Sequence, residues 1–193
     1  MTAQAYARVQ PGSMTDASLV RRALEGDARA FTLLVDRHLQ PCLRFATRML
    51  GSRHDAEDAT QEALLRAYRA LASYESQTPF RTWLFAILVN RCRTALLQRG
   101  RYLRRVVADD EVLARATSND TGASTELRIE IERAVAMLEP DQREAFLLKY
   151  VEQLSYEEIA SATGVGISAL KMRVKRACER LQSLLNEVND VRR

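Results

Sequence analysis

The sequence predicts an all-α protein with two small helical domains joined by a flexible linker, the C-terminal domain carrying a helix-turn-helix. Apolar residues recur at the spacing of buried helix faces through most of the 193 residues. Seven glycines and four prolines leave little room for hairpin turns, whereas Ala, Leu, Arg and Glu, which favour helices, are abundant. Between residues 117 and 122 the run Thr-Ser-Asn-Asp-Thr-Gly breaks the periodicity and is typical of a linker. Together these observations predict two helical units on a tether.

The chain divides into four expected parts. These are a disordered lead over 1–15, a first domain over 16–100, a linker over 101–124 and a second domain over 125–193. In the first domain, Gly26 separates a short helix from a longer one that is punctuated by Pro41.

Capping signals place two further helices in the first domain. One is expected over 55–73, with Asp55 in the cap position. The other is expected to run to about residue 99 from the pair Thr78 and Pro79, a capping hydroxyl before a proline at the first helical position.

One face of the expected 55–73 helix combines acid, amide and leucine. Helical spacing brings together a set that we call the acidic face, Asp58, Gln61, Glu62 and Leu65. The buried side is expected to carry Leu64, Tyr68 and Leu71. A leucine beside two carboxylates suits docking onto a basic protein surface, where charge steers and an apolar contact anchors. Spacing alone favours the alternative, an ordinary solvated face.

A second surface is basic without interruption. No carboxylate lies between Glu75 and Asp109, whereas that stretch holds Arg81, Arg91, Arg93, Arg99, Arg101, Arg104 and Arg105. The polar loop before it reads Ser73, Tyr74, Glu75, Ser76, Gln77 and Thr78. Cations follow phosphates, and a polar loop can bind an extruded base, so these arginines favour nucleic acid over a solvated face of mixed charge. Phe80 and Trp83 are interpreted as core residues, with base stacking as the alternative.

The clearest motif lies in the second domain, after helices expected over 125–138 and from Pro140. Ser155 and Glu158 form a capping box, and Gly164 suits the left-handed end of a short helix. A buried stripe follows at helical spacing, Ile167, Leu170, Val174, Ala177 and Leu181. The opposite side carries Lys171, Arg173, Lys175 and Arg176. This pattern predicts a helix-turn-helix whose second helix enters the DNA major groove, with a solvated surface helix as the alternative.

Composition excludes several classes of protein. Cys42, Cys92 and Cys178 are odd in number and lack metal-ligand spacing, so they are expected to be small buried side chains. No apolar run approaches the ~20 residues that span a bilayer, and no secretory signal is visible, which predicts a cytoplasmic protein. Only His38 and His54 are available for catalysis, and no phosphate loop or zinc motif is present, so we expect neither an enzyme nor a cofactor or metal.

Several runs resemble a known family. DAEDATQEALLRAYRAL from residue 55, FRTWL from residue 80 and NRCR from residue 90 resemble the second conserved region of the extracytoplasmic-function sigma factors. LEPDQREAFLL from residue 138, LSYEEIA from residue 154 and KMRVKRA from residue 171 resemble their fourth region. The family's fold agrees with the two helical domains expected from the residues.

The resemblance implies a bacterial initiation factor that binds core RNA polymerase and promoter DNA. The acidic face would meet the clamp helices of the largest polymerase subunit. Non-template bases of the minus-ten element would bind a set that we call the arginine surface, the loop 73–78 with Arg81, Asn90 and Arg93. The minus-thirty-five element would bind the recognition surface, Ser168, Lys171, Met172, Arg173, Lys175 and Arg176. The family also implies an anti-sigma partner.

Three other functions remain as alternatives. A transcriptional regulator with an N-terminal sensor domain would explain the helix-turn-helix but neither the acidic face nor the arginine surface. A nuclease would need metal ligands, and Asp55, Glu57 and Asp58 are better explained as acids at a helix start. A helical adaptor without a DNA role would leave both basic surfaces unexplained.

Overall fold

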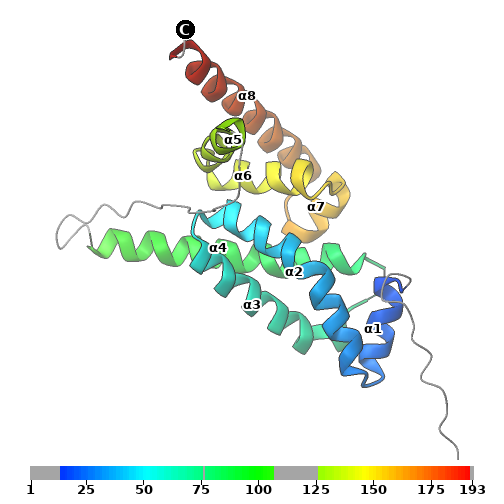
Figure 1. Ribbon diagram of the computed structural model, residues 1–193. Coiled ribbons are helices and arrows are strands. Elements are labelled where there is room, and N and C mark those ends of the chain that lie inside the picture. Colours follow the sequence, from blue (N-terminus) through cyan, green and yellow to red (C-terminus); the bar gives the residue numbers. More distant parts are fainter. Residues whose placement is uncertain (1–13, 76, 107–125, 192–193) are drawn as a thin grey trace, which may run out of the picture.

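The computed structural model describes residues 14–75, 77–106 and 126–191, and every regular element assigned there is helical. The first domain contains α1 (Asp16–Leu24), α2 (Ala28–Leu50), α3 (Arg53–Ala70), the short η1 (Leu71–Ser73) and α4 (Phe80–Val106). The second contains α5 (Glu126–Ala136), α6 (Pro140–Phe146), the π-helical turn η2 (Leu147–Val151), α7 (Tyr156–Thr163) and α8 (Ile167–Val191). Figure 1 shows α5 to α8 stacked on α1 to α4. The all-helical, two-domain prediction is confirmed; the expected lead, except its last two residues, and most of the expected linker lie outside the described residues.

The helix α2 continues through Pro41 without the interruption that the proline suggested. A proline inside a helix removes one backbone hydrogen bond. Here Leu34, Cys42 and Phe45 are buried on either side of it, and tertiary packing of such a face stabilises a helix more than local propensity does. The helix ends at Gly51, whose φ of 69° is left-handed.

The helix α3 corrects two expectations. It begins at Arg53, and its N-cap is Ser52, whose Oγ accepts a hydrogen bond from the Asp55 backbone 3.3 Å away. Tyr68, expected to be buried, is 58% exposed, and its ring meets that of Phe31 edge-on. Leu71 is buried and Leu64 is half-buried against the core, as expected. The fully buried residues within α3 itself are small: Ala56, Ala59, Thr60, Ala63 and Ala67. These small side chains let α3 lie close to both α2 and α4.

The helix α4 runs seven residues beyond the expected end near Arg99 and supplies much of the core. Phe85 is fully buried and packs edge-on against Phe45 of α2, with ring centroids 5.5 Å apart. Cys42 and Cys92 are buried, as expected, and burial raises the pKa of each thiol to about 12. Cys178 of α8, also expected to be buried, is only half-buried.

The helix-turn-helix is confirmed in its details. Ser155 and Glu158 form the capping box, with bonds of 2.8 and 3.1 Å, and Gly164 ends α7 with a φ of 70°. The expected stripe of α8 is buried at Leu170, Val174, Ala177 and Leu181, and half-buried at Ile167. The turn η2 was not anticipated from the sequence. Two residues after its end at Val151 lies Gln153, a non-glycine residue with a left-handed φ of 56°.

Candidate functional site

The acidic face lies on the outward side of α3. Asp58, Gln61 and Leu65 are exposed, and Glu62 is half-buried. The Nε of Arg66 donates a 2.7 Å hydrogen bond to Glu62, which holds the pKa of that carboxyl below its ordinary value. The four residues therefore share one accessible surface that offers negative charge and an apolar side chain together.

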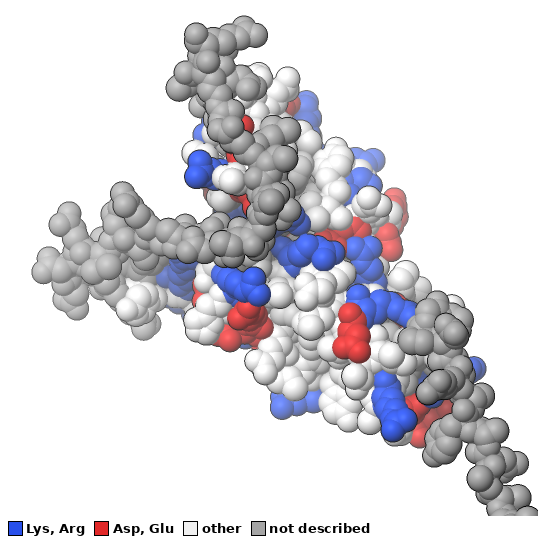
Figure 2. All heavy atoms as spheres, in the orientation of Figure 1, with Lys and Arg blue, Asp and Glu red and all other residues white. Residues whose placement is uncertain are grey.

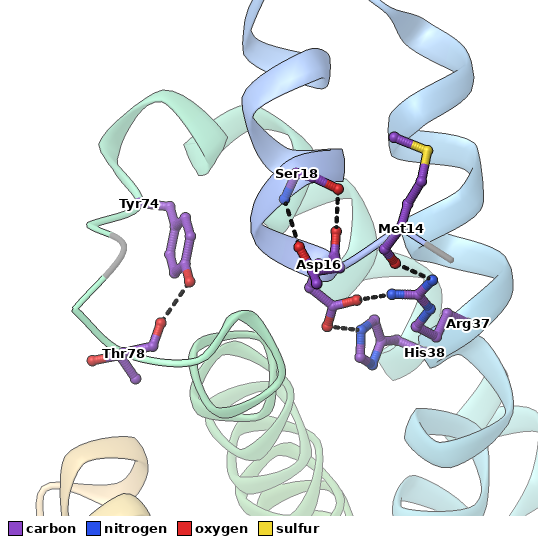
Figure 3. A network of polar contacts seen from close by, with 8 residues as sticks. Met14, Asp16, Ser18, Arg37, His38, Tyr74 and Thr78 are labelled. Atoms are coloured by element: carbon purple, nitrogen blue, oxygen red, sulfur yellow. Dashed lines mark hydrogen bonds and ion pairs between the residues drawn. The ribbon is translucent and has the colours of Figure 1, made fainter. Parts of the chain in front are cut away.

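The loop of the arginine surface is braced from within. The Tyr74 hydroxyl donates a 2.5 Å hydrogen bond to the Thr78 carbonyl, across the loop (Figure 3). The Tyr74 ring also lies 5.1 Å from that of Trp83 and 5.8 Å from that of Phe80, between centroids. Phe80 is buried, as expected of a core residue, and Trp83 is half-buried.

The polar residues of this loop face outward around that brace. Glu75 and Gln77 are exposed, and Ser73 is exposed with its hydroxyl donating to the Ala70 carbonyl at 2.7 Å. Ser76 lies outside the described residues. Side chains that could hydrogen-bond a base therefore flank an aromatic support.

A polar network behind the loop was not anticipated from the sequence. Asp16, in the first turn of α1, accepts a hydrogen bond from Arg37 and lies 2.8 Å from the His38 Nε2 (Figure 3). The His38 ring lies 5.5 Å from that of Phe80, between centroids. These contacts connect α1 and α2 to the start of α4. The partners lie about twenty residues apart, so no local spacing could have indicated them.

The arginines of the arginine surface contact the second domain. Arg93 donates two 2.7 Å hydrogen bonds to the carboxylate of Glu144, from Nε and Nη2, and a third of 3.2 Å to the Thr163 carbonyl. Arg81 Nη2 lies 2.5 Å from Glu152 Oε2. The side chains of Glu144 and Glu152 are only 2% and 3% exposed.

Two consequences follow for the arginine surface. The paired Glu144 raises the pKa of Arg93. Asn90, by contrast, is exposed, and its backbone carbonyl accepts a hydrogen bond from the Thr94 hydroxyl at 2.8 Å. In this arrangement the two arginines are occupied while the loop remains accessible.

The recognition surface is open. Ser168, Lys171, Met172, Lys175 and Arg176 are exposed on α8. Arg173 is half-buried and pairs with Asp141 of α6 at 2.7 Å. Lys171 and Lys149 lie over the Tyr156 ring, at 5.7 and 4.8 Å from its centroid. The structure thus brings all six predicted residues onto one helix whose opposite stripe is buried.

Charge is distributed unevenly over the molecule. On the face shown in Figure 2, basic and acidic side chains lie side by side along the boundary between the two groups of helices. In the part of the chain that the structure describes, no helix combines the length and the apolar character needed to cross a bilayer. Within the same residues, no three His, Cys, Asp or Glu side chains are grouped to hold a metal ion.

Comparison with known proteins finds similarity in both domains. Residues 34–102 match Sigma-70 region 2, and residues 128–181 match Sigma-70, region 4. The ECF RNA polymerase sigma-E factor of Haemophilus influenzae is 33% identical over 184 residues, covering 88% of this chain and 95% of that protein. The sigma-E factor of Escherichia coli K12 is 34% identical over 182 residues, covering 88% and 94%.

Two solved structures have a similar fold. The sigma factor RpoE of Bartonella quintana, in complex with the anti-sigma factor NepR, gives a TM-score of 0.71 at 31% identity over 82% of this chain and 98% of that one. CnrH, in complex with the cytosolic domain of CnrY, gives a TM-score of 0.65 at 27% identity over 89% and 97%. Both likenesses extend over the two helical domains.

Proposed function

The chain belongs to the extracytoplasmic-function sigma factors of the sigma-70 family, and we propose that it brings core RNA polymerase to its promoters through the three surfaces defined above. The acidic face docks on the polymerase, the arginine surface binds the parted strand of the minus-ten element, and the recognition surface reads the minus-thirty-five element.

One observation carries this proposal. Two independent domains each match their own sigma-70 region, and each presents on its exterior the chemistry that its role needs. The exposed Leu65 among carboxylates suits polymerase docking, and the basic exposed side of α8 suits the major groove. A regulator with a sensor domain would not need the first of these.

The division of labour is physically sound. Binding of duplex DNA by one domain sets the register, while binding of unstacked bases by the other favours strand opening, each stacking contact being worth ~1–3 kcal/mol. Neither contact needs high affinity alone, because attachment to polymerase raises the effective concentration of the second contact.

The proposal includes regulation and location. Since RpoE is found with an anti-sigma factor, we extend such a partner to this chain. We further assign the chain a non-catalytic role as an initiation subunit in the cytoplasm, where polymerase and promoter are found.

Run-off transcription with core polymerase and genomic fragments tests the proposal. The wild-type chain should yield transcripts with defined starts only when core polymerase is present. Leu65→Ala with Gln61→Ala should weaken binding to core polymerase while leaving helical content unchanged. Failure of the wild-type chain to bind core polymerase, or to initiate at a defined start, would refute the proposed function.

A further inference from the structure

The N-terminal half of α4 is joined to the second domain by polar contacts. Three of its side chains take part, with the pairs Arg81 and Glu152, Thr82 and Glu158, and Arg93 and Glu144. The helix α4 packs against α7, and α2 contacts α5, α6 and η2, so the two domains meet over a continuous seam (Figure 1). Two of the three α4 side chains belong to the arginine surface.

The Arg93 contact has the geometry of oxyanion recognition. Two nitrogens of the guanidinium meet the two oxygens of the Glu144 carboxylate, each at 2.7 Å. A phosphate presents two oxygens to an arginine in the same forked manner. Because Glu144 is 2% exposed, the closed seam leaves no space for a phosphate at these nitrogens. The carboxylate occupies the site that a nucleic-acid backbone would need.

The backbone of the second domain directs Glu152 into the same seam. At the end of the π-helical turn η2, the Glu152 backbone N–H donates a 2.9 Å hydrogen bond to the Leu147 carbonyl. The next residue, Gln153, has a left-handed φ of 56°. The Leu154 backbone N–H then donates a 3.0 Å hydrogen bond to the Leu148 carbonyl. A left-handed conformation is unfavourable for a residue with a Cβ, so it persists only where the surroundings enforce it. The result is a carboxylate buried against Arg81.

We propose that Glu144 and Glu152 are intramolecular occupants of the arginine surface, so that closing of the two domains and binding of a nucleic-acid strand compete for Arg93 and Arg81. We call this pair of contacts the carboxylate latch. The assignment of the competing ligand rests on the proposed function, whereas the latch itself rests on the seam.

A seam built on ion pairs is suited to opening. Removing two charges from water offsets much of their mutual attraction, so buried pairs hold an interface less firmly than apolar packing of the same size would. When the domains part, water rehydrates both carboxylates, and the arginines become available to a polyanion. Strand binding then gains the release of counterions from the DNA. The latch therefore keeps the free protein closed and yields to nucleic acid.

Neutralising the carboxylates in the full-length protein tests the latch. Glu144→Gln with Glu152→Gln removes both charges, and the matched control, Glu139→Gln with Glu157→Gln, makes the same charge change at exposed sites of the second domain. Small-angle X-ray scattering measures the radius of gyration, and fluorescence anisotropy measures binding of a labelled oligothymidine single strand.

The latch variant should expand and bind the oligothymidine more tightly than either the wild type or the control. If about 90% of the wild-type molecules are closed, the apparent dissociation constant should fall by about tenfold, since affinity scales with the competent fraction. An unchanged radius, or a gain in affinity no greater than that of the control, overturns the proposal.

A charge exchange decides the question if the glutamine variants lose helical content in circular dichroism. Arg93→Glu alone should expand the protein, and adding Glu144→Arg should make it compact again without restoring binding of the oligothymidine. Failure of the second substitution to restore compactness overturns the latch. Since these measurements need no polymerase, a failed latch is distinguishable from a failed run-off assay, which would refute the proposed function alone.

Discussion

The two surfaces that we propose for DNA binding use the same residue type in different surroundings. Arg93 of the arginine surface pairs with a carboxylate that is 2% exposed, whereas Arg173 of the recognition surface pairs with Asp141, whose side chain is 65% exposed. A buried partner makes the loss of either ion severe, because the other is left without water. An exposed partner is already solvated, and such pairs contribute little.

The difference teaches which surface is ready to bind. In the closed arrangement Asp141, the partner of Arg173, is largely exposed, so we expect a DNA phosphate or base to displace it with little loss of free energy, and the rest of the recognition surface is exposed. Arg81 and Arg93 of the arginine surface are paired with buried carboxylates until the seam opens, although the loop and Asn90 are exposed. If the proposed latch operates, a conformational step that exposes Glu144 and Glu152 separates duplex contact from strand contact.

The largest expected effect is the difference in stability between the variants Arg93→Ala and Arg173→Ala. Arg93→Ala leaves Glu144 buried without its partner, which should destabilise the closed arrangement by about 3–5 kcal/mol. Arg173→Ala should change stability by at most about 1 kcal/mol, because its pair is exposed. Urea denaturation followed by circular dichroism checks both, and the first variant should unfold in two separated transitions. Equal effects of the two substitutions would contradict the distinction.

At promoters that depend on the minus-thirty-five element, we expect Arg173→Ala to have the larger effect on transcription, although it has the smaller effect on stability. Arg173→Ala should weaken run-off transcription by ~1–3 kcal/mol if the guanidinium contacts a base, and by less if it contacts a phosphate. Changing the bases of the minus-thirty-five element one at a time separates the two cases, since only a lost base contact relaxes the preference at one position. Unchanged run-off transcription would remove Arg173 from the proposed recognition surface.

Much of the second domain could be predicted because its signals are local. The capping box at Ser155, the turn at Gly164 and the apolar stripe of α8 each lie within a few residues, and all three are confirmed. The buried side of α3 was partly wrong because helical spacing does not say how closely helices approach. Alanines allow close approach, so they filled the buried side and Tyr68 was displaced to the surface.

The carboxylate latch could not be predicted from local patterns. Arg93 and Glu144 lie 51 residues apart, and Arg81 and Glu152 lie 71 apart, on opposite sides of the expected linker. The stretch without acids after Glu75 drew attention to its arginines, but it could not show that the carboxylates that pair with them come from the other domain. Pairing across a seam depends on how two folded domains meet.

A smaller effect is expected at the loop of the arginine surface. Tyr74→Phe removes the hydroxyl that donates to the Thr78 carbonyl and keeps the ring against Trp83. One hydrogen bond contributes about 0.5–1.5 kcal/mol, so stability should fall only slightly, while the loop becomes less ordered. Run-off transcription from a promoter with an already opened minus-ten region should decrease. Tyr68→Phe, on the exposed side of α3, is the control and should leave that activity unchanged.

The smallest effect is a dependence on pH at Glu158, where the helix-turn-helix meets α4. Its carboxylate accepts hydrogen bonds from the Ser155 backbone and from the Thr82 hydroxyl, and the first of these is the main cause of a pKa below the ordinary value of 4.5. A group whose pKa is lower in the folded state stabilises the fold fully above its unfolded pKa, and loses this contribution as the pH falls through the folded pKa.

Glu158→Gln keeps one side-chain oxygen that can accept from the Ser155 backbone, and its amide nitrogen can donate to the Thr82 hydroxyl. The substitution removes the charge from the first turn of α7, a change expected to cost about 0.3–1 kcal/mol. The free energy of unfolding of the wild type should exceed that of the variant by a constant amount from pH 7 to pH 5. The difference should shrink as the pH is lowered below about 4.5, because the wild-type carboxylate is then protonated as well. Urea denaturation at each pH measures it. Glu157→Gln, in the same turn but outside the capping box, is the matched control, and an equal acid dependence in that variant would show that the capping carboxylate has no special part in joining the two regions.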